Sequence, residues 1–269
     1  MSSTHHLDIL RQGVAAWNQW RLDCPEISPN LRGIDFKEQE LAGVNFSNTV
    51  LVDAELGGCD LHEADLRSAD LSRAILPSSF LANADLGGAC LRNARMSGCF
   101  FEGTNFAEAN LEGADLTSAY LGGTRFQGAK LRGANMRSAH LGMAELQGAD
   151  LWGANLQTSN LSDADLSQAN LRTTELQAAN LSGAKLQKAR LTLANLRRAT
   201  LKGTDLRNAN LRAAYLEEAD LRGADLSGAN MSGSHCEGAD LEGAIFSGTN
   251  LKNAALCHQN MELASLQVV

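Results

Sequence analysis

Residues 114–118 read Ala-Asp-Leu-Thr-Ser, and this pattern of a small, a polar and a large apolar residue followed by two turn-forming residues runs through most of the chain. A large apolar residue occupies every position whose number ends in 1 or 6, from Leu31 to Leu266. Over these 48 consecutive repeats the apolar residue is leucine 37 times, and the small residue two places earlier is alanine 32 times. A pattern held in step for so long predicts one structural unit repeated many times.

A period of five fits neither of the regular secondary structures. A helix turns once in about 3.6 residues, so an apolar residue at every fifth place would drift around its surface. Strand side chains alternate between two faces, so an odd period would send successive leucines to opposite sides. We therefore expect the chain to turn once per repeat and to wind into a tube, with leucine and alanine inside and the turn residues at the corners. Backbone hydrogen bonds would join stacked coils at the strand spacing of about 4.8 Å.

The pattern A-[D/N]-L-x-x resembles that of the pentapeptide-repeat family of bacteria, and residues 10–21 are similar to leaders of its cyanobacterial members. The resemblance covers residues 31–266. It implies an all-β fold, a right-handed quadrilateral β-solenoid with four repeats, or 20 residues, in each coil. The 48 repeats would then make about 12 coils and a rod about 55–60 Å long. Membership of this family implies no single activity.

The first 30 residues follow a different pattern and predict an N-terminal capping α-helix. Apolar residues fall at helical spacing at Leu7, Leu10, Val14 and Trp17. This spacing predicts a helix over about residues 5–21, in which Trp17 or Trp20 covers the first coil. Terminal coils of a solenoid need such covers because they otherwise expose core and unpaired backbone. We divide the chain into a helical cap and lead-in, 1–30, and a solenoid, 31–269.

Composition and motif content argue against an enzyme. None of the six histidines belongs to an H-E-x-x-H motif, and no G-x-S-x-G, phosphate-loop or dinucleotide fingerprint occurs. We therefore expect no catalytic residue, no metal site and no cofactor. The six cysteines form no C-x-x-C pair, and the sequence has neither a secretory leader nor a membrane-spanning apolar run. These features predict a cytoplasmic protein.

On a coil of 20 residues the outward side chains sort into four faces, two of which carry opposite charge. The face centred on Leu31, Leu51 and their equivalents, named the basic face, has nine bases and four acids. Its bases are Arg32, Arg73, Arg92, Lys130, Arg132, Arg172, Arg190, Arg212 and Lys252. The opposite face, centred on Leu41 and Leu61 and named the acidic face, has nine acids and two bases. Its acids are Glu40, Asp60, Glu63, Glu102, Asp163, Asp220, Asp240, Glu242 and Glu262.

The acidic face also carries four ring side chains, Phe80, Phe100, Tyr120 and His140, at intervals of 20 residues. They are named the aromatic column, and each stands where the repeat prefers Asp or Asn. Met143 lies beside the end of this column. Two interpretations stay open: a ladder of stacked rings that stabilises neighbouring coils, or an exposed apolar stripe that binds a partner.

Three functions remain open at this point. The first is a non-enzymatic scaffold that presents one face of the rod to a protein partner, because solenoids act mainly through long ordered surfaces. The second follows from the resemblance, since some family members protect DNA gyrase by presenting an acidic rod shaped like duplex DNA. The acidic face favours this reading, whereas the basic face and an uninterrupted repeat oppose it. Direct binding of nucleic acid is the least favoured, because a net charge of −8 opposes attraction to phosphate.

The C-terminal repeats predict a homodimer. Apolar residues gather there at Leu256, Met261, Leu263, Leu266 and Val268. An uncovered end coil would expose both its core and its backbone edge, and a two-fold dimer would cover both ends at once. Some members of the family dimerise through C-terminal coils. The alternative is that the last residues fold back across their own coil.

Overall fold

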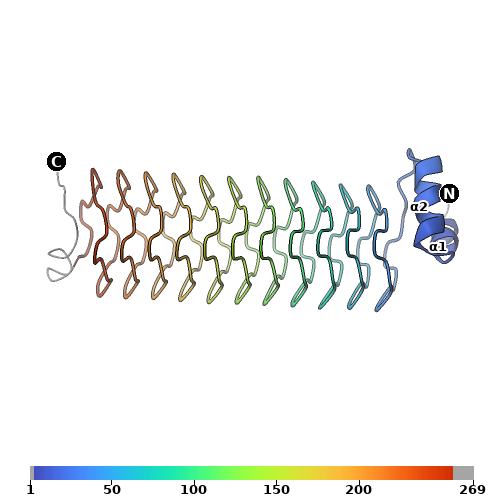
Figure 1. Cartoon of the computed structure of the whole chain (residues 1–269), viewed down its shortest axis with the longest axis horizontal. Coiled ribbons are helices and arrows are strands. Elements are labelled where there is room, and N and C mark those ends of the chain that lie inside the picture. Colours follow the sequence, from blue (N-terminus) through green and yellow to red (C-terminus); the bar gives the residue numbers. More distant parts are fainter. Residues whose placement is uncertain (1–2, 257–269) are drawn as a thin grey trace.

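The computed structural model describes residues 3–256 and shows a long rod of stacked coils with two short helices at its N-terminal end (Figure 1). Helix α1 spans Ser3–Leu10 and helix α2 spans Val14–Asp23. The coils begin at Asn30, the first residue that forms a β-bridge. None of the helices in the described part of the chain is long and apolar enough to span a membrane.

Parallel bridges between residues 20 apart in sequence hold the coils together. They occur at every fifth residue, from Asn30↔Val50 to His235↔Ala255. Each coil therefore contains 20 residues and four bridged segments, and side chains 20 apart stack directly in columns. The predicted solenoid and the 20-residue stacking period are thus seen in the structure. Each bridged segment is a single residue long, because a turn begins directly after it in every five-residue repeat.

A repeat with Asp or Asn before the leucine can satisfy all five of its backbone N–H groups, as residues 115–119 illustrate. The N–H of Leu116 and that of Ser118 donate to Asn135 and Arg137 of the next coil, at 2.7 and 2.9 Å. Asp115 donates to Ala94 of the preceding coil, and Ala119 closes the turn on Leu116. The fifth N–H, of Thr117, donates to Oδ1 of Asp115 at 3.1 Å. This last bond explains why Asp or Asn precedes the leucine: its side chain replaces a missing backbone acceptor.

The third residue of each turn adopts positive φ throughout the rod. Every residue whose number ends in 3 or 8, from Gly33 to Asn253, has φ between 52° and 70°. A positive φ at the third position and a hydrogen bond from the fourth residue to the first define turns of the type II class. Glycine is suited to this conformation, yet fewer than half of these positions are glycine. The stacked ladder therefore imposes the turn on residues that do not favour it.

The interior of the tube is filled by the two predicted inward columns. The apolar residues at numbers ending in 1 and 6 and their small partners are almost all fully buried from Phe46 to Phe246. Where the small residue is Thr or Cys, its side chain usually donates to a carbonyl 23 residues earlier, although Thr124 donates to Leu121 O, three residues earlier. Thr104 Oγ1 donates to Leu81 O at 2.6 Å, and Cys99 Sγ donates to Leu76 O. Polar atoms thus enter the core only with a partner.

The N-terminal segment forms two helices rather than the single helix predicted over residues 5–21. Gly13 lies between them with φ of 105°, a conformation that a helix does not contain and that glycine tolerates best. Helix α2 carries Trp17, which is completely buried and packs edge-on against Phe46, with 5.6 Å between ring centroids. Its Nε1 donates to Asn45 O at 2.7 Å.

Polar side chains of α2 bind the exposed backbone edge of the first coil. Asn18 accepts from the N–H of Asn45 at 2.8 Å and donates to Gly43 O at 2.9 Å. Arg21 is buried and donates to Ser47 O at 2.9 Å. Burial lowers the pKa of its guanidinium from the usual value. The helix thus covers apolar residues and supplies partners to backbone groups that no preceding coil can reach.

Candidate functional site

The aromatic column is a continuous stack of rings across four coils. Successive ring centroids are 5.0 Å apart for Phe80 and Phe100, 4.8 Å for Phe100 and Tyr120, and 4.9 Å for Tyr120 and His140. The planes of each pair lie within 11° of parallel. Phe80 and Tyr120 stay about 40% exposed, and the neighbouring Met143 is 71% exposed. The column is therefore both a stacked ladder and an exposed apolar surface.

In each coil of the aromatic column, one hydrogen bond of the turn is missing. Elsewhere, except at Asn170, the Asp or Asn before the leucine accepts the N–H two residues later, as Asp115 does from Thr117. A ring cannot accept that bond, and within the described part of the chain the N–H groups of Glu102 and Gly122 have no protein acceptor. A stacked aromatic pair contributes about 0.5–1.5 kcal/mol, similar to the net value of the lost bond. Fold stability alone therefore gives little reason for rings at these positions.

The acidic face is less uniformly negative than its composition indicates. Asp220 receives Arg222 at 2.7 Å and lies 3.3 Å from Lys202, and Arg222 also reaches Asp240 at 3.3 Å. The hydrogen bond from Arg222 lowers the pKa of Asp220 to about 2. Ion pairs to Lys or Arg within residues 3–256 are absent for six of its acids, and one of these, Asp60, pairs with His62 instead. The other five are Glu40, Glu63, Glu102, Asp163 and Glu242. The remaining predicted member, Glu262, lies outside the described residues.

The basic face contains a shallow hollow that the sequence did not reveal. The hollow has a volume of about 250 Å³ and is lined by Arg132, Trp152, Asn170 and Arg172. Trp152 is half exposed, and the guanidinium carbon of Arg132 lies 5.9 Å from the centre of its ring. Arg132, Trp152 and Arg172 are 20 residues apart, so their shared column was readable from the sequence. The prediction included the two arginines and missed the tryptophan.

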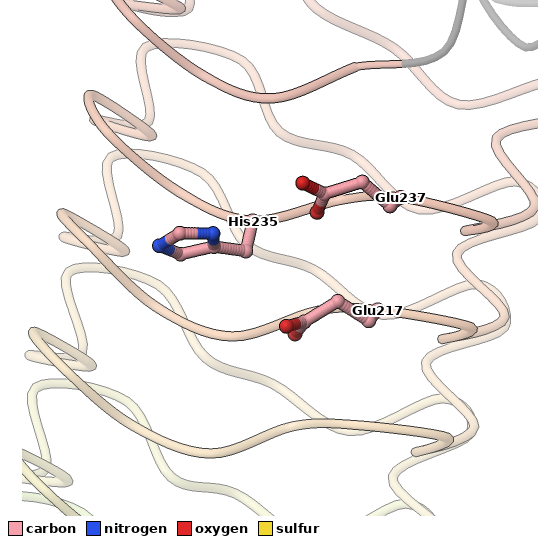
Figure 2. Close-up of side chains that lie close together, drawn as sticks. All are labelled: Glu217, His235 and Glu237. Atoms are coloured by element: carbon pink, nitrogen blue, oxygen red, sulfur yellow. The ribbon is translucent and has the colours of Figure 1, made fainter.

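A second group that the sequence did not reveal consists of Glu217, His235 and Glu237 (Figure 2). The two glutamates occupy equivalent places in successive coils, and His235 precedes Glu237 by two residues. Their donor atoms lie within 4.8 Å of one another. His235 stacks on Tyr215 with 5.1 Å between ring centres, and Glu217 accepts from Arg197 at 2.8 Å. The group is thus held by contacts to rings and cations on the same face.

This group is the part of the described chain best suited to hold a metal ion, since imidazole and carboxylate are ligands of zinc and similar ions. Donor atoms in a tetrahedral zinc site, with bonds of about 2.0–2.1 Å, lie about 3.4 Å apart. The spacing of up to 4.8 Å is wider, so the exposed His235 and Glu237 would have to move to close around an ion. Arg197 already neutralises Glu217. As placed, the three side chains form a polar surface cluster.

The predicted dimer end is mostly outside the described residues. Met261, Leu263, Leu266 and Val268 all belong to the part of the chain that is not described. Leu256 is the last described residue and packs, partly buried, against the core. The C-terminal homodimer therefore stays a prediction.

The columns, turns and 20-residue coils agree with a family model. Pentapeptide repeats match the chain in eight copies that together span residues 30–248. The chain belongs to the pentapeptide-repeat family. The family resemblance predicted from the A-[D/N]-L-x-x pattern is thereby confirmed.

Several solved structures of this family are similar to the chain. HetL, a pentapeptide repeat protein involved in heterocyst differentiation regulation in the cyanobacterium Nostoc, is 34% identical over 84% of this chain and 86% of its own, with a TM-score of 0.46. A pentapeptide repeat protein of the Arabidopsis thaliana thylakoid lumen is 30% identical over 40% of this chain and 71% of its own, with a TM-score of 0.34. QnrB1, a plasmid-mediated fluoroquinolone resistance protein, is 17% identical over 88% and 99%, with a TM-score of 0.38. No curated protein matches the chain.

Proposed function

We propose that this pentapeptide-repeat protein is a non-enzymatic scaffold that binds a protein partner through the face bearing the aromatic column. The observation that carries the proposal is the column itself: four stacked rings, two of them about 40% exposed, with Met143 projecting beside them. Exposed aromatic and methionine side chains on a rigid backbone favour protein contacts, because they add apolar area with little loss of freedom. Each ring also replaces a residue that would complete its turn.

The test is the double variant Phe100→Asn with Tyr120→Asn. Asparagine restores the turn acceptor, so we expect the thermal unfolding midpoint and the circular dichroism spectrum to stay close to those of the parent protein. A partner isolated with the wild-type rod from cells of the source organism would then be purified and titrated against both proteins. We expect binding to the double variant to be at least tenfold weaker.

The matched control is Tyr215→Asn, which removes a stacked aromatic residue from a different face. Binding by this variant should equal that of the wild type. Unchanged affinity of the Phe100→Asn, Tyr120→Asn variant would show that the column is a structural ladder only.

A second candidate is mimicry of DNA toward a topoisomerase such as gyrase. The acids of the acidic face that lack a Lys or Arg partner, among them Glu40, Glu102 and Asp163, favour it. The pairing of Asp220 and Asp240 with Arg222 reduces the negative charge of the mimic, and the basic face would repel a surface that binds DNA. A supercoiling assay with gyrase, with and without the purified protein, separates the two proposals.

The finer features of the fold and its setting are part of the same proposal. We propose a right-handed, four-sided path of about twelve coils, with α1 and α2 acting as the N-terminal cap and with a C-terminal homodimer. The contacts of Trp17, Asn18 and Arg21 with the first coil support the capping role. A cytoplasmic location is consistent with the free cysteines of the described chain.

A further inference from the structure

We propose that the C-terminal half of the basic face binds an extended acidic polypeptide segment, with the hollow around Trp152 as its anchor. This proposal goes beyond the role of the aromatic column, because it concerns the opposite face and is tested without that column's partner. The ligand is identified by its chemistry: carboxylates for the cations, and apolar side chains for the exposed Trp152 and Leu193.

Asp150 contacts two of the residues that line the hollow, Arg132 and Asn170. The Asp150 carboxylate pairs with Arg132 and accepts from Asn170 Nδ2 at 2.7 Å. A carboxylate can only accept, so the amide nitrogen of Asn170 must face it and Oδ1 must face away. Asn170 Oδ1 is buried without a hydrogen-bond partner. The ion pair with Asp150 thus positions Arg132 beside the ring of Trp152. Asn170 Oδ1 remains an acceptor that no other group of the hollow satisfies.

Arg172 supplies the charge that a carboxylate would bind. It lines the hollow on the coil after Trp152, and its exposed guanidinium has no carboxylate within ion-pair distance in the described chain. By contrast, Arg32, Arg73 and Arg92, toward the other end of the basic face, pair with Asp53 or Glu112. The guanidinium of Arg172 is a planar fork, and it can bind a carboxylate through two hydrogen bonds beside the exposed ring of Trp152, which lines the same hollow.

The same face continues with free cations and a second hollow. Among residues 3–256, no ion pair is formed by Lys130, Arg190, Arg212 or Lys252. Arg212 and Lys252 line a hollow of about 450 Å³ together with Ser232 and Gly233. Four coils separate the two hollows, or about 19 Å at the strand spacing, which an extended chain of about six residues covers.

The apolar residues of this face favour a polypeptide over a nucleic acid. Trp152 is 50% exposed and Leu193, two coils further along, is 47% exposed. Two coils correspond to about 10 Å, or three residues of a peptide in the extended polyproline-II conformation, in which side chains three residues apart lie on the same side. A base could stack on Trp152 but would gain little from contact with Leu193. An acidic peptide with apolar residues three apart matches both kinds of contact.

The test uses a fluorescein-labelled 12-residue peptide of aspartate and glutamate with leucine at every third position. Its binding to the full-length protein is measured by fluorescence anisotropy in 50 mM salt. We expect saturable binding by the wild type that weakens at least tenfold in Arg172→Gln and in Trp152→Ala. Both side chains are exposed, so the circular dichroism spectrum should be unchanged in each variant.

The matched control is Arg137→Gln, which removes from another face an exposed arginine that forms no ion pair among residues 3–256. It should change the affinity less than twofold. The same peptide with lysine in place of its acids should not bind. The proposal would be overturned if the acidic peptide did not bind at 1 mM, or if Arg172→Gln bound it as tightly as the wild type does. It would also be overturned if a 12-nucleotide single strand bound more tightly than the peptide. Finally, if the wild type self-associated and Trp152→Ala did not, a second copy of this chain would be the occupant of the hollow.

Discussion

Leu151 and Trp152 are neighbours in the chain and stand on opposite sides of the wall of the tube. Leu151 is fully buried, whereas Trp152 is half exposed. The backbone around them makes the same hydrogen bonds as the neighbouring coils. At the inward place of Leu151, the equivalent residues elsewhere are also large and apolar, but at the outward place of Trp152 they include arginine, threonine, serine and lysine.

The comparison shows that the inward columns define the fold and leave the outward columns free to vary. A narrow tube has room for one large and one small residue on each side, so its interior tolerates few alternatives. An outward side chain contacts other outward side chains and solvent rather than the packed interior, so rings, cations and acids are all accommodated there. The faces of the rod can therefore be changed for binding without altering the path of the chain.

The largest expected effect is that of Leu151→Asp. It places an unpaired carboxylate in the tube and removes the packing of a buried leucine, so we expect a loss of at least about 4 kcal/mol in the free energy of unfolding. Urea denaturation followed by circular dichroism measures this loss. The matched change Trp152→Asp should alter stability by no more than about 0.5 kcal/mol. Similar losses for both variants would contradict the inward assignment.

The next effect concerns the ion pairs of the outward columns, which should depend on pH. The pKa of Asp220 is lowered to about 2 by its hydrogen bond from Arg222, and the ordinary value is 3.8. A lowered carboxyl pKa stabilises the fold above the unfolded-state value, and this contribution is lost as the pH falls from about 4 to 2. With the side chain 24% exposed to screening, we expect about 1–2 kcal/mol.

Arg222→Gln provides the comparison for this prediction. The variant lacks the main cause of the lowered pKa, so its stability should fall less than that of the wild type between pH 5 and pH 2. Thermal unfolding at both pH values measures the difference. Parallel curves for the two proteins would show that the pair contributes nothing.

The sequence predicted the inside of this molecule better than its outside. The inward columns, the 20-residue stacking and the aromatic column all follow from counting in fives and twenties. The break at Gly13 was missed because the apolar spacing of residues 7–17 continues across it, whereas the positive φ is a property of the backbone. The Trp152 hollow was missed because faces were sorted by charge, and its shape depends on how Asp150 orients its neighbours.

The group of Glu217, His235 and Glu237 was missed for a related reason. Metal-binding motifs such as H-E-x-x-H bring their ligands together from positions close in sequence, but on a solenoid the ligands come from successive coils, 18 or 20 residues apart. Comparing each residue with those 18 and 20 positions away would have brought these three together. Which of them face one another is decided by side-chain rotamers, and the repeat pattern contains no information on these.

The smallest expected effect is at the corners, where inward and outward columns meet. Ala178 adopts φ of 53°, which glycine reaches more easily than alanine. Ala178→Gly should therefore relieve strain in the folded rod. Glycine also increases the conformational entropy of the unfolded chain, which offsets part of this effect, so we expect a net gain of roughly 0.5–1 kcal/mol in the free energy of unfolding. Gly133 provides the reverse experiment: its φ is 61°, and a Cβ added there would meet nothing within 4 Å. Gly133→Ala should lower the free energy of unfolding by about as much as Ala178→Gly raises it. The added Cβ makes no new contact, so only the preference of alanine and glycine for this backbone conformation matters. Urea denaturation of both variants measures the pair, and a loss of stability in Ala178→Gly would show that the ladder imposes this turn without strain.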